Sequence, residues 1–345
     1  MKHYVTVLAL ASFAACGDSD KTDADFQADV VDSMHDSIAV DLDDLVTAAQ
    51  QLQAAAPTHA WSKTADAAAI DDMRAAWKRT RVAYEHVEGA TAPIFGDLDV
   101  TLDARYDDYL NALIPNGDTN LFDDKGVTGM HGIERILYAL DIRPEVVDFE
   151  AALPGYQPAK YPSTTEEAMS FKNVLCQKLI KDAMSLRDQW QPAAIDIGAA
   201  YQGLVGLMNE QKEKVNLAAT GEEESRYANL TLFDLRNNLE GTLKAYDLFR
   251  DWIKSKPDGT APDSTIQQKL AGLKTLYNGT SGESLPAVPD DWSADAPTQA
   301  NLATPFGVMW KSVHESVDPN TSGSVVFEMN RIAVLLGFEE FVEGE

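Results

Sequence analysis

Apolar residues recur every three or four positions along most of this chain, which is the period of an amphipathic α-helix. No segment of the sequence shows the strict alternation that is typical of a half-buried strand. The pattern therefore predicts an all-α protein. The predicted helices cover residues 26–56, 66–90, 102–114, 129–140, 166–191, 194–217, 228–253, 264–277, 305–317 and 324–336.

A proline-rich segment, residues 153–163, interrupts this pattern near the middle of the chain. Proline ends helices because it lacks a backbone donor, and the Ser-Thr-Thr-Glu-Glu stretch that follows is a typical helix start. We therefore expect two helical-bundle domains, an N-terminal domain of residues 24–153 and a C-terminal domain of residues 154–345. Each half combines long helices with one helix that has a polar face, which indicates a distant duplication.

The N-terminus has the order of residues that is typical of a lipoprotein signal peptide. Lys2 precedes the apolar residues 4–11, which are too few to cross a bilayer, and small residues lead up to Cys16. We expect residues 1–15 to be removed, Cys16 to carry the lipid and residues 16–23 to form a polar tether; plain secretion with cleavage is the alternative. Because Gly17 and not an aspartate directly follows Cys16, the likeness to bacterial lipoproteins favours an outer-membrane anchor facing the periplasm.

The composition limits the possible partners. The chain has 55 acidic and 28 basic residues and a formal net charge of −27. This charge repels phosphate backbones and excludes nucleic acid, and it favours cations unless it serves only as a solvated surface. The second cysteine is Cys176, so no disulfide can form within the chain once Cys16 carries lipid. Stability must then come from the hydrophobic core.

A GxHxxE motif, formed by residues 129–134, carries the clearest chemical signal. On a helix, His131 and Glu134 lie three positions apart and therefore share one face. An imidazole and a carboxylate at this spacing are typical of a metal-ligand pair. The alternative for His131 is an imidazole that is solvated or hydrogen-bonded within the fold.

A second polar face precedes this motif. Trp77, Arg81, Tyr84 and Glu88 follow one another at spacings of four, three and four, so all four project from one face of a helix. Glu88 is then expected to point inward with the aromatic residues. A buried acid is costly unless it is paired, protonated or bound to a metal. Tyr84 is expected either to pack in the core or to add a phenolate or a hydrogen bond to the site.

Asp103 follows in an acidic segment that we expect to form a turn before the next helix, where Asp97 and Asp99 are close enough in sequence to replace it. We expect a site of three carboxylates and one imidazole, a donor set that suits iron, manganese or zinc. Arg81 and Arg135 are expected to keep the acids ionised and oriented when metal is absent. The predicted ligands are Glu88, Asp103, His131 and Glu134.

Several strings of the sequence resemble the imelysin family, helical proteins once grouped with peptidases and linked to bacterial iron uptake, and the related periplasmic proteins of Efe-type iron transport. In chain order the strings are WKRTRVAYEHVE, FGDLDVTLDAR, GMHGIE, SRYANLTLFDLRNNLEGTL, TPFGVMWKSV and SVVFEMNRIAVLLGF. The resemblance implies that the two halves pack pseudo-symmetrically with their polar faces meeting across a cleft. Asp234 and Asn238 would then support the ligands or contact substrate, the alternative being a bond to a neighbouring turn.

The resemblance implies a lipid-anchored protein that binds iron or an iron complex for acquisition, with an envelope iron transporter as a possible partner. The first alternative is a metallopeptidase. Helical zinc peptidases carry HExxH or HxxEH, whereas here Arg135 follows Glu134 and no other histidine stands at such a spacing from His131. We therefore favour binding over catalysis. The second alternative is a haem- or polysaccharide-binding module with a structural metal.

Overall fold

The computed structural model describes residues 21–114 and 116–343 of the chain. Within these residues it consists of helices and loops and contains no strand, so the prediction of an all-α helical bundle is confirmed. The signal peptide, Cys16 and the first residues of the tether lie outside the described residues. The tether's end is helical, because Thr22 caps the first helix and accepts a hydrogen bond from the Asp25 backbone N–H.

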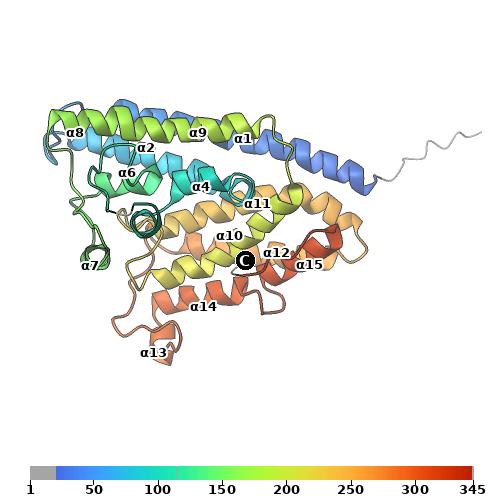
Figure 1. Ribbon diagram of the computed structural model, residues 1–345. Helices are drawn as coiled ribbons and strands as arrows, with labels where there is room; N and C mark the ends of the chain where they lie inside the picture. The colour runs from blue at the N-terminus through green and yellow to red at the C-terminus, as the bar shows by residue number, and fades with distance from the viewer. Residues whose placement is uncertain (1–20, 115, 344–345) are drawn as a thin grey trace, which may run out of the picture.

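Three long helices run side by side along one side of the molecule (Figure 1). They are α1 (Asp23–Ala55), α2 (Ala67–Glu85) and α9 (Cys176–Trp190), and α9 continues from α8 (Thr165–Ser170) and the π-helix η2 (Phe171–Leu175). The proline-rich segment predicts that α9 belongs to the C-terminal domain, whereas α9 packs along α1. The division of the chain at residue 153 stays a prediction.

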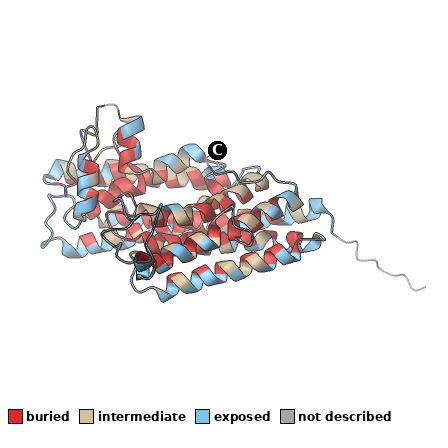
Figure 2. Cartoon of the chain, turned by 90° about the horizontal axis from the view of Figure 1, so that it is seen from below, coloured by how far each residue is buried: buried red, intermediate tan, exposed pale blue. Residues whose placement is uncertain are grey.

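The other side of the molecule is formed by the helices of the second half (Figure 1). These are α10 (Ile197–Leu217), α11 (Thr231–Ser255), α12 (Thr260–Gly279), α14 (Pro305–Val317) and α15 (Val325–Leu336), with the short α13 (Gln299–Leu302) beside α14. Buried residues lie along the inner faces of the helices (Figure 2), and one continuous apolar core runs through both sides. None of the described helices is long and apolar enough to span a bilayer.

Short helices connect the two sides and carry most of the polar residues of interest. They are α3 (Glu88–Thr91), α4 (Gly96–Asp103), α5 (Tyr106–Asp108), the π-helix η1 (Tyr109–Leu113), α6 (Gly129–Leu137) and α7 (Pro144–Ala151). Asp97 and Asp99 lie in the first turn of α4 and not in the turn that the sequence predicts. Acidic side chains stabilise the positive N-terminal end of a helix, which explains this difference.

The predicted helix 66–90 is broken after Glu85, and Glu88 begins the separate helix α3. At the break, Gly241 of α11 lies against the backbone of His86, where a Cβ atom would come within 2.6 Å of the His86 Cα. A Cβ atom on Gly203 of α10 would come within 2.0 Å of the Gly89 carbonyl oxygen. The second half of the chain therefore contacts the first at the helix break, next to Glu88.

Candidate metal centre

The close approach of α6 to the end of α4 places His131 beside Asp103. Gly129, the first residue of α6, has a positive φ of 77°, a conformation that glycine adopts without strain. A Cβ atom at this position would lie 2.7 Å from the carbonyl oxygens of Thr101 and Leu102. Glycine is therefore required at the first position of the GxHxxE motif, because any side chain there would push α4 and α6 apart.

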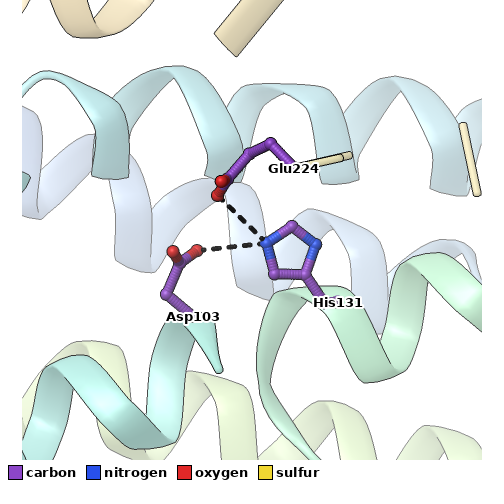
Figure 3. Close-up of side chains that lie close together, drawn as sticks. All are labelled: Asp103, His131 and Glu224. Carbon is purple, nitrogen blue, oxygen red and sulfur yellow. Dashed lines mark ion pairs between the residues drawn. The ribbon is translucent and has the colours of Figure 1, made fainter. Parts of the chain in front are cut away.

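Three side chains converge at this point (Figure 3). The Nε2 atom of His131 lies 3.5 Å from Asp103 Oδ1 and 3.5 Å from Glu224 Oε1. The ligand atoms of these three residues, which we call the triad, all lie within 4.8 Å of one another. Two donors bound to one ion at about 2.1 Å are separated by roughly 3 to 3.5 Å, so the two distances from His131 Nε2 fit a shared ion.

Glu134 holds the other nitrogen of the imidazole. Its Oε2 accepts a hydrogen bond from His131 Nδ1 at 2.7 Å, and its Oε1 accepts from the backbone N–H groups of Tyr227 and Ala228 at 3.0 and 2.8 Å. Both carboxylate oxygens are therefore occupied on the side of the ring away from the triad. This is the arrangement in which a carboxylate orients a metal-binding histidine.

The imidazole is fully buried, and its Nε2 atom has no hydrogen-bond partner among the described residues. Burial and the nearby Arg81 lower the pKa of His131, but the neighbouring carboxylates of Asp103, Glu134 and Glu224 outweigh them and raise it well above its usual value. Without a metal, Nε2 therefore carries a proton directed at the two carboxylates. A metal ion would take the place of this proton.

Glu224 is the member of the triad that the sequence does not predict. It lies in the segment between α10 and α11, where no helical period marks a face. A turn positions it, since the Arg226 backbone N–H donates to the Glu224 carbonyl and that of Leu230 donates to the Ser225 carbonyl. The available signal is its place directly before the SRYANL string that resembles the imelysin family.

Arg81 is the principal cation at the triad. It is fully buried and forms ion pairs with four carboxylates, those of Glu85, Asp103, Glu224 and Asp234. The Glu224 Oε1 contact is 3.1 Å long and the Asp234 Oδ1 contact 3.4 Å. Arg81 therefore links Asp103 to Asp234.

Glu88 lies on a different part of the site and is not a member of the triad. Its Oε2 accepts a hydrogen bond from Asn238 Nδ2 at 2.9 Å, and Asn238 Oδ1 accepts one from Lys214 Nζ at 3.0 Å. Lys214 also lies 3.6 Å from Glu224 Oε2. A chain of polar contacts thus links Glu88 through Asn238 and Lys214 to the triad.

The carboxyl groups of the site fall into two classes. Although burial raises their pKa values, Arg81 and His131 hold the pKa of Asp103 below its usual value, and Lys214, His131 and Arg81 hold that of Glu224 well below. Burial raises the pKa of Glu88 well above its usual value and that of Asp234 to about 6. The two carboxylates that face His131 are therefore the ones kept ionised.

The remaining predicted residues lie at the margin of the site or outside it. The Tyr84 hydroxyl donates to Asp99 Oδ1 on the cavity wall. Arg135 points the other way, where it pairs with Glu150 at 3.0 Å and its guanidinium lies 3.8 Å from the centre of the Tyr106 ring. Among the described residues, the Arg135 guanidinium thus forms an ion pair with Glu150 and with none of the four predicted ligands.

A cavity of about 520 Å³ opens beside the triad. Its polar wall is strongly acidic, because only two basic residues, Arg105 and Lys214, contribute to it. Such a wall attracts cations and repels anions. The acidic residues that line it are Glu88, Asp99, Asp103, Asp108, Glu210, Glu213 and Glu224.

Comparison with known proteins agrees with the helical fold. The imelysin family model matches residues 38–303. The chain belongs to the imelysin family. An imelysin-like protein from Psychrobacter arcticum 273-4 has the same fold, with a TM-score of 0.56 and 13% identity over 94% of this chain and 99% of that one.

Two curated relatives are more similar in sequence. An Efem/EfeO family lipoprotein of Staphylococcus aureus (strain MSSA476) is 28% identical over 210 residues, which cover 61% of this chain and 60% of the relative. The iron uptake system component EfeO of Escherichia coli K12 is 26% identical over 235 residues, 68% of this chain and 52% of the relative. The matches thus span between half and two thirds of the length of these relatives.

Proposed function

We propose that this protein binds a multivalent metal ion, iron foremost and zinc as the second candidate, at Asp103, His131 and Glu224. The observation that carries the proposal is the buried His131 Nε2, which has no hydrogen-bond partner in the described part of the chain and faces two carboxylate oxygens at 3.5 Å. One imidazole with several carboxylates suits hard and borderline cations. Glu134 then orients the imidazole and is not a ligand itself.

The proposed biological role is iron acquisition at the bacterial envelope. It is supported by the relatives, one of which is named an iron uptake component and another an Efem/EfeO family lipoprotein. The acidic cavity favours a cation over an anionic iron complex as the cargo. Cys16 would carry a lipid that anchors the protein to the outer membrane facing the periplasm, and an envelope iron transporter would receive the ion.

Metal titration of the purified protein tests the proposal. Protein prepared without an affinity tag is titrated with ferrous iron and with zinc in a calorimeter, next to His131→Ala and Glu224→Gln variants. We expect each variant to bind at least about tenfold more weakly while it keeps its helical content, because both residues contact the ion. Glu222→Gln is the matched control, since its half-exposed side chain lies two residues away and outside the triad.

Two results would contradict the proposal. One is a wild-type protein that binds neither ion, and the other is unchanged affinity in both ligand variants. A loss of affinity in Glu222→Gln as large as that in Glu224→Gln would point to a disturbed loop rather than a lost ligand.

A further inference from the structure

Arg81 and the proposed metal ion require the same two oxygen atoms. Asp103 Oδ1 faces His131 Nε2 and also pairs with Arg81 Nη1, and Glu224 Oε1 faces His131 Nε2 and also pairs with Arg81 Nη2. An ion that binds Asp103 and Glu224 at about 2.1 Å would lie too close to a guanidinium at its present position. Arg81 must therefore move when the ion enters.

A second position for the guanidinium is already present. Arg81 also pairs with Glu85 Oε1 through Nη2 and with Asp234 Oδ1 through Nε, and neither of these two acids is a member of the triad. The other oxygens of these two acids, Glu85 Oε2 and Asp234 Oδ2, are buried and have no hydrogen-bond partner among the described residues. Buried acceptors without partners are costly, so two unsatisfied carboxylate oxygens next to a cation need an explanation.

We infer that Arg81 is a positioning residue with two alternative places: in the absence of metal it pairs with Asp103 and Glu224, and in the metal complex it withdraws to Glu85 and Asp234. This inference rests on the proposed metal site. Two of the four acids around Arg81 then bind the ion, and the other two bind the displaced guanidinium. The movement is short, because Arg81 contacts all four acids already.

The exchange has a consequence for ion specificity. The guanidinium carries a single positive charge and makes charge-assisted hydrogen bonds to both ligands. A monovalent ion gains too little from the same carboxylates to displace it, whereas an ion of charge two or three gains more. Arg81 thereby keeps the site closed to sodium and potassium and open to multivalent metals.

A double-mutant cycle measures whether the effect of Glu85 on zinc affinity depends on Arg81. Zinc affinity is measured by calorimetry for wild type, Glu85→Gln, Asp234→Asn, Arg81→Gln and the Arg81→Gln/Glu85→Gln double variant, with circular dichroism as the check of folding. We expect Glu85→Gln and Asp234→Asn to bind zinc about tenfold more weakly, although neither is a ligand, and Glu85→Gln to have little effect when Arg81 is absent. If Glu85→Gln weakens zinc binding only because it removes a negative charge, the same loss of zinc affinity will be found when Arg81 is absent. That result would overturn the inference.

Asp263→Asn is the matched control, since Asp263 is a buried acid paired with Arg250 on α11, outside the site. It should leave zinc affinity unchanged. If the Arg81 variants do not fold, a crystal structure of the zinc-loaded wild type decides. Arg81 paired with Glu85 and Asp234 alone is the expected result, and Arg81 still paired with Asp103 and Glu224 beside a bound ion contradicts it. A wild type that binds neither zinc nor iron contradicts the proposed function itself.

Discussion

The Nδ1–H of His131 donates a hydrogen bond of 2.7 Å to Glu134 Oε2, and this contact fixes which nitrogen of the imidazole faces the triad. Two backbone N–H groups hold the other oxygen of Glu134, so the carboxylate cannot turn without losing them. The GxHxxE motif therefore supplies one donor atom and the group that orients it. The second and third donors come from other segments of the chain.

Substitution of Glu134 should weaken metal binding without removing a ligand. In Glu134→Gln the amide loses the negative charge that stabilises the imidazole, so we expect iron and zinc affinity to fall by about 10- to 100-fold. Calorimetric titration measures the change, and circular dichroism should show an unchanged helix content. An affinity equal to that of wild type would mean that Glu134 does not orient the ligand.

Asp103 and Glu88 should differ in their contributions to metal affinity. Asp103→Asn removes a proposed ligand and should reduce affinity by at least about tenfold, whereas Glu88→Gln should have a smaller effect because Glu88 lies outside the triad. The same titration of Asp97→Asn and Asp99→Asn tests the neighbouring acids. A loss of affinity confined to Asp97 or Asp99 would show that the wrong aspartate is assigned.

Folding stability should depend on the protonation of His314, which lies away from the triad. Burial and the charge of Lys212 lower the pKa of His314 to about 4, and its ring stacks on Trp310. Below pH 6.5 the unfolded chain binds a proton at His314 that the folded chain does not bind. The free energy of unfolding therefore decreases as the pH falls from about 6.5 to about 4. Because the ring is partly exposed, we expect this decrease in the free energy of unfolding to be roughly 1–2 kcal/mol.

Urea unfolding at pH 7 and pH 4.5 measures this effect. The free energy of unfolding should fall less in His314→Gln than in wild type, because glutamine does not titrate. Equal pH dependence in the two proteins would show that the pKa of His314 is not lowered on folding.

The protein should not act as a metallopeptidase. The sequence lacks HExxH and HxxEH, and in the structure both oxygens of Glu134 are engaged by His131 and by two backbone N–H groups. A general base needs to be within reach of a metal-bound water. Protein loaded with zinc or iron should show no chelator-sensitive cleavage of denatured casein. Turnover abolished both by chelator and by Glu134→Gln would contradict this prediction, whereas cleavage that persists in the variant would come from a contaminant.

The helical fold could be predicted from the sequence because it depends on local periodicity. The break after Glu85 could not, since the apolar pattern continues through it and the close contact with Gly241 of α11 is a tertiary feature. For the same reason the pattern gives no indication that α9 packs on α1. Periodicity reports which face of a helix is buried but not what covers it.

The residues of the candidate site could likewise be predicted from the sequence only in part. His131 and Arg81 stand out because each lies on a helix face whose neighbours are predicted to be buried. Glu224 does not, because a loop residue has no periodic pattern and its position depends on the packing of the segment before α11. Glu134 shares a face with His131 by spacing, but spacing cannot say whether its carboxylate points toward an ion or toward the ring beside it.

Anomalous diffraction from crystals of the iron-loaded protein, recorded at the iron absorption edge, shows whether the triad holds the ion. We expect one principal peak that lies within bonding distance of His131 Nε2, Asp103 Oδ1 and Glu224 Oε1, with Glu134 still hydrogen-bonded to His131 Nδ1. A peak held by Glu88 and Glu210 on the cavity wall, or a fully loaded protein without a peak at His131, would contradict it.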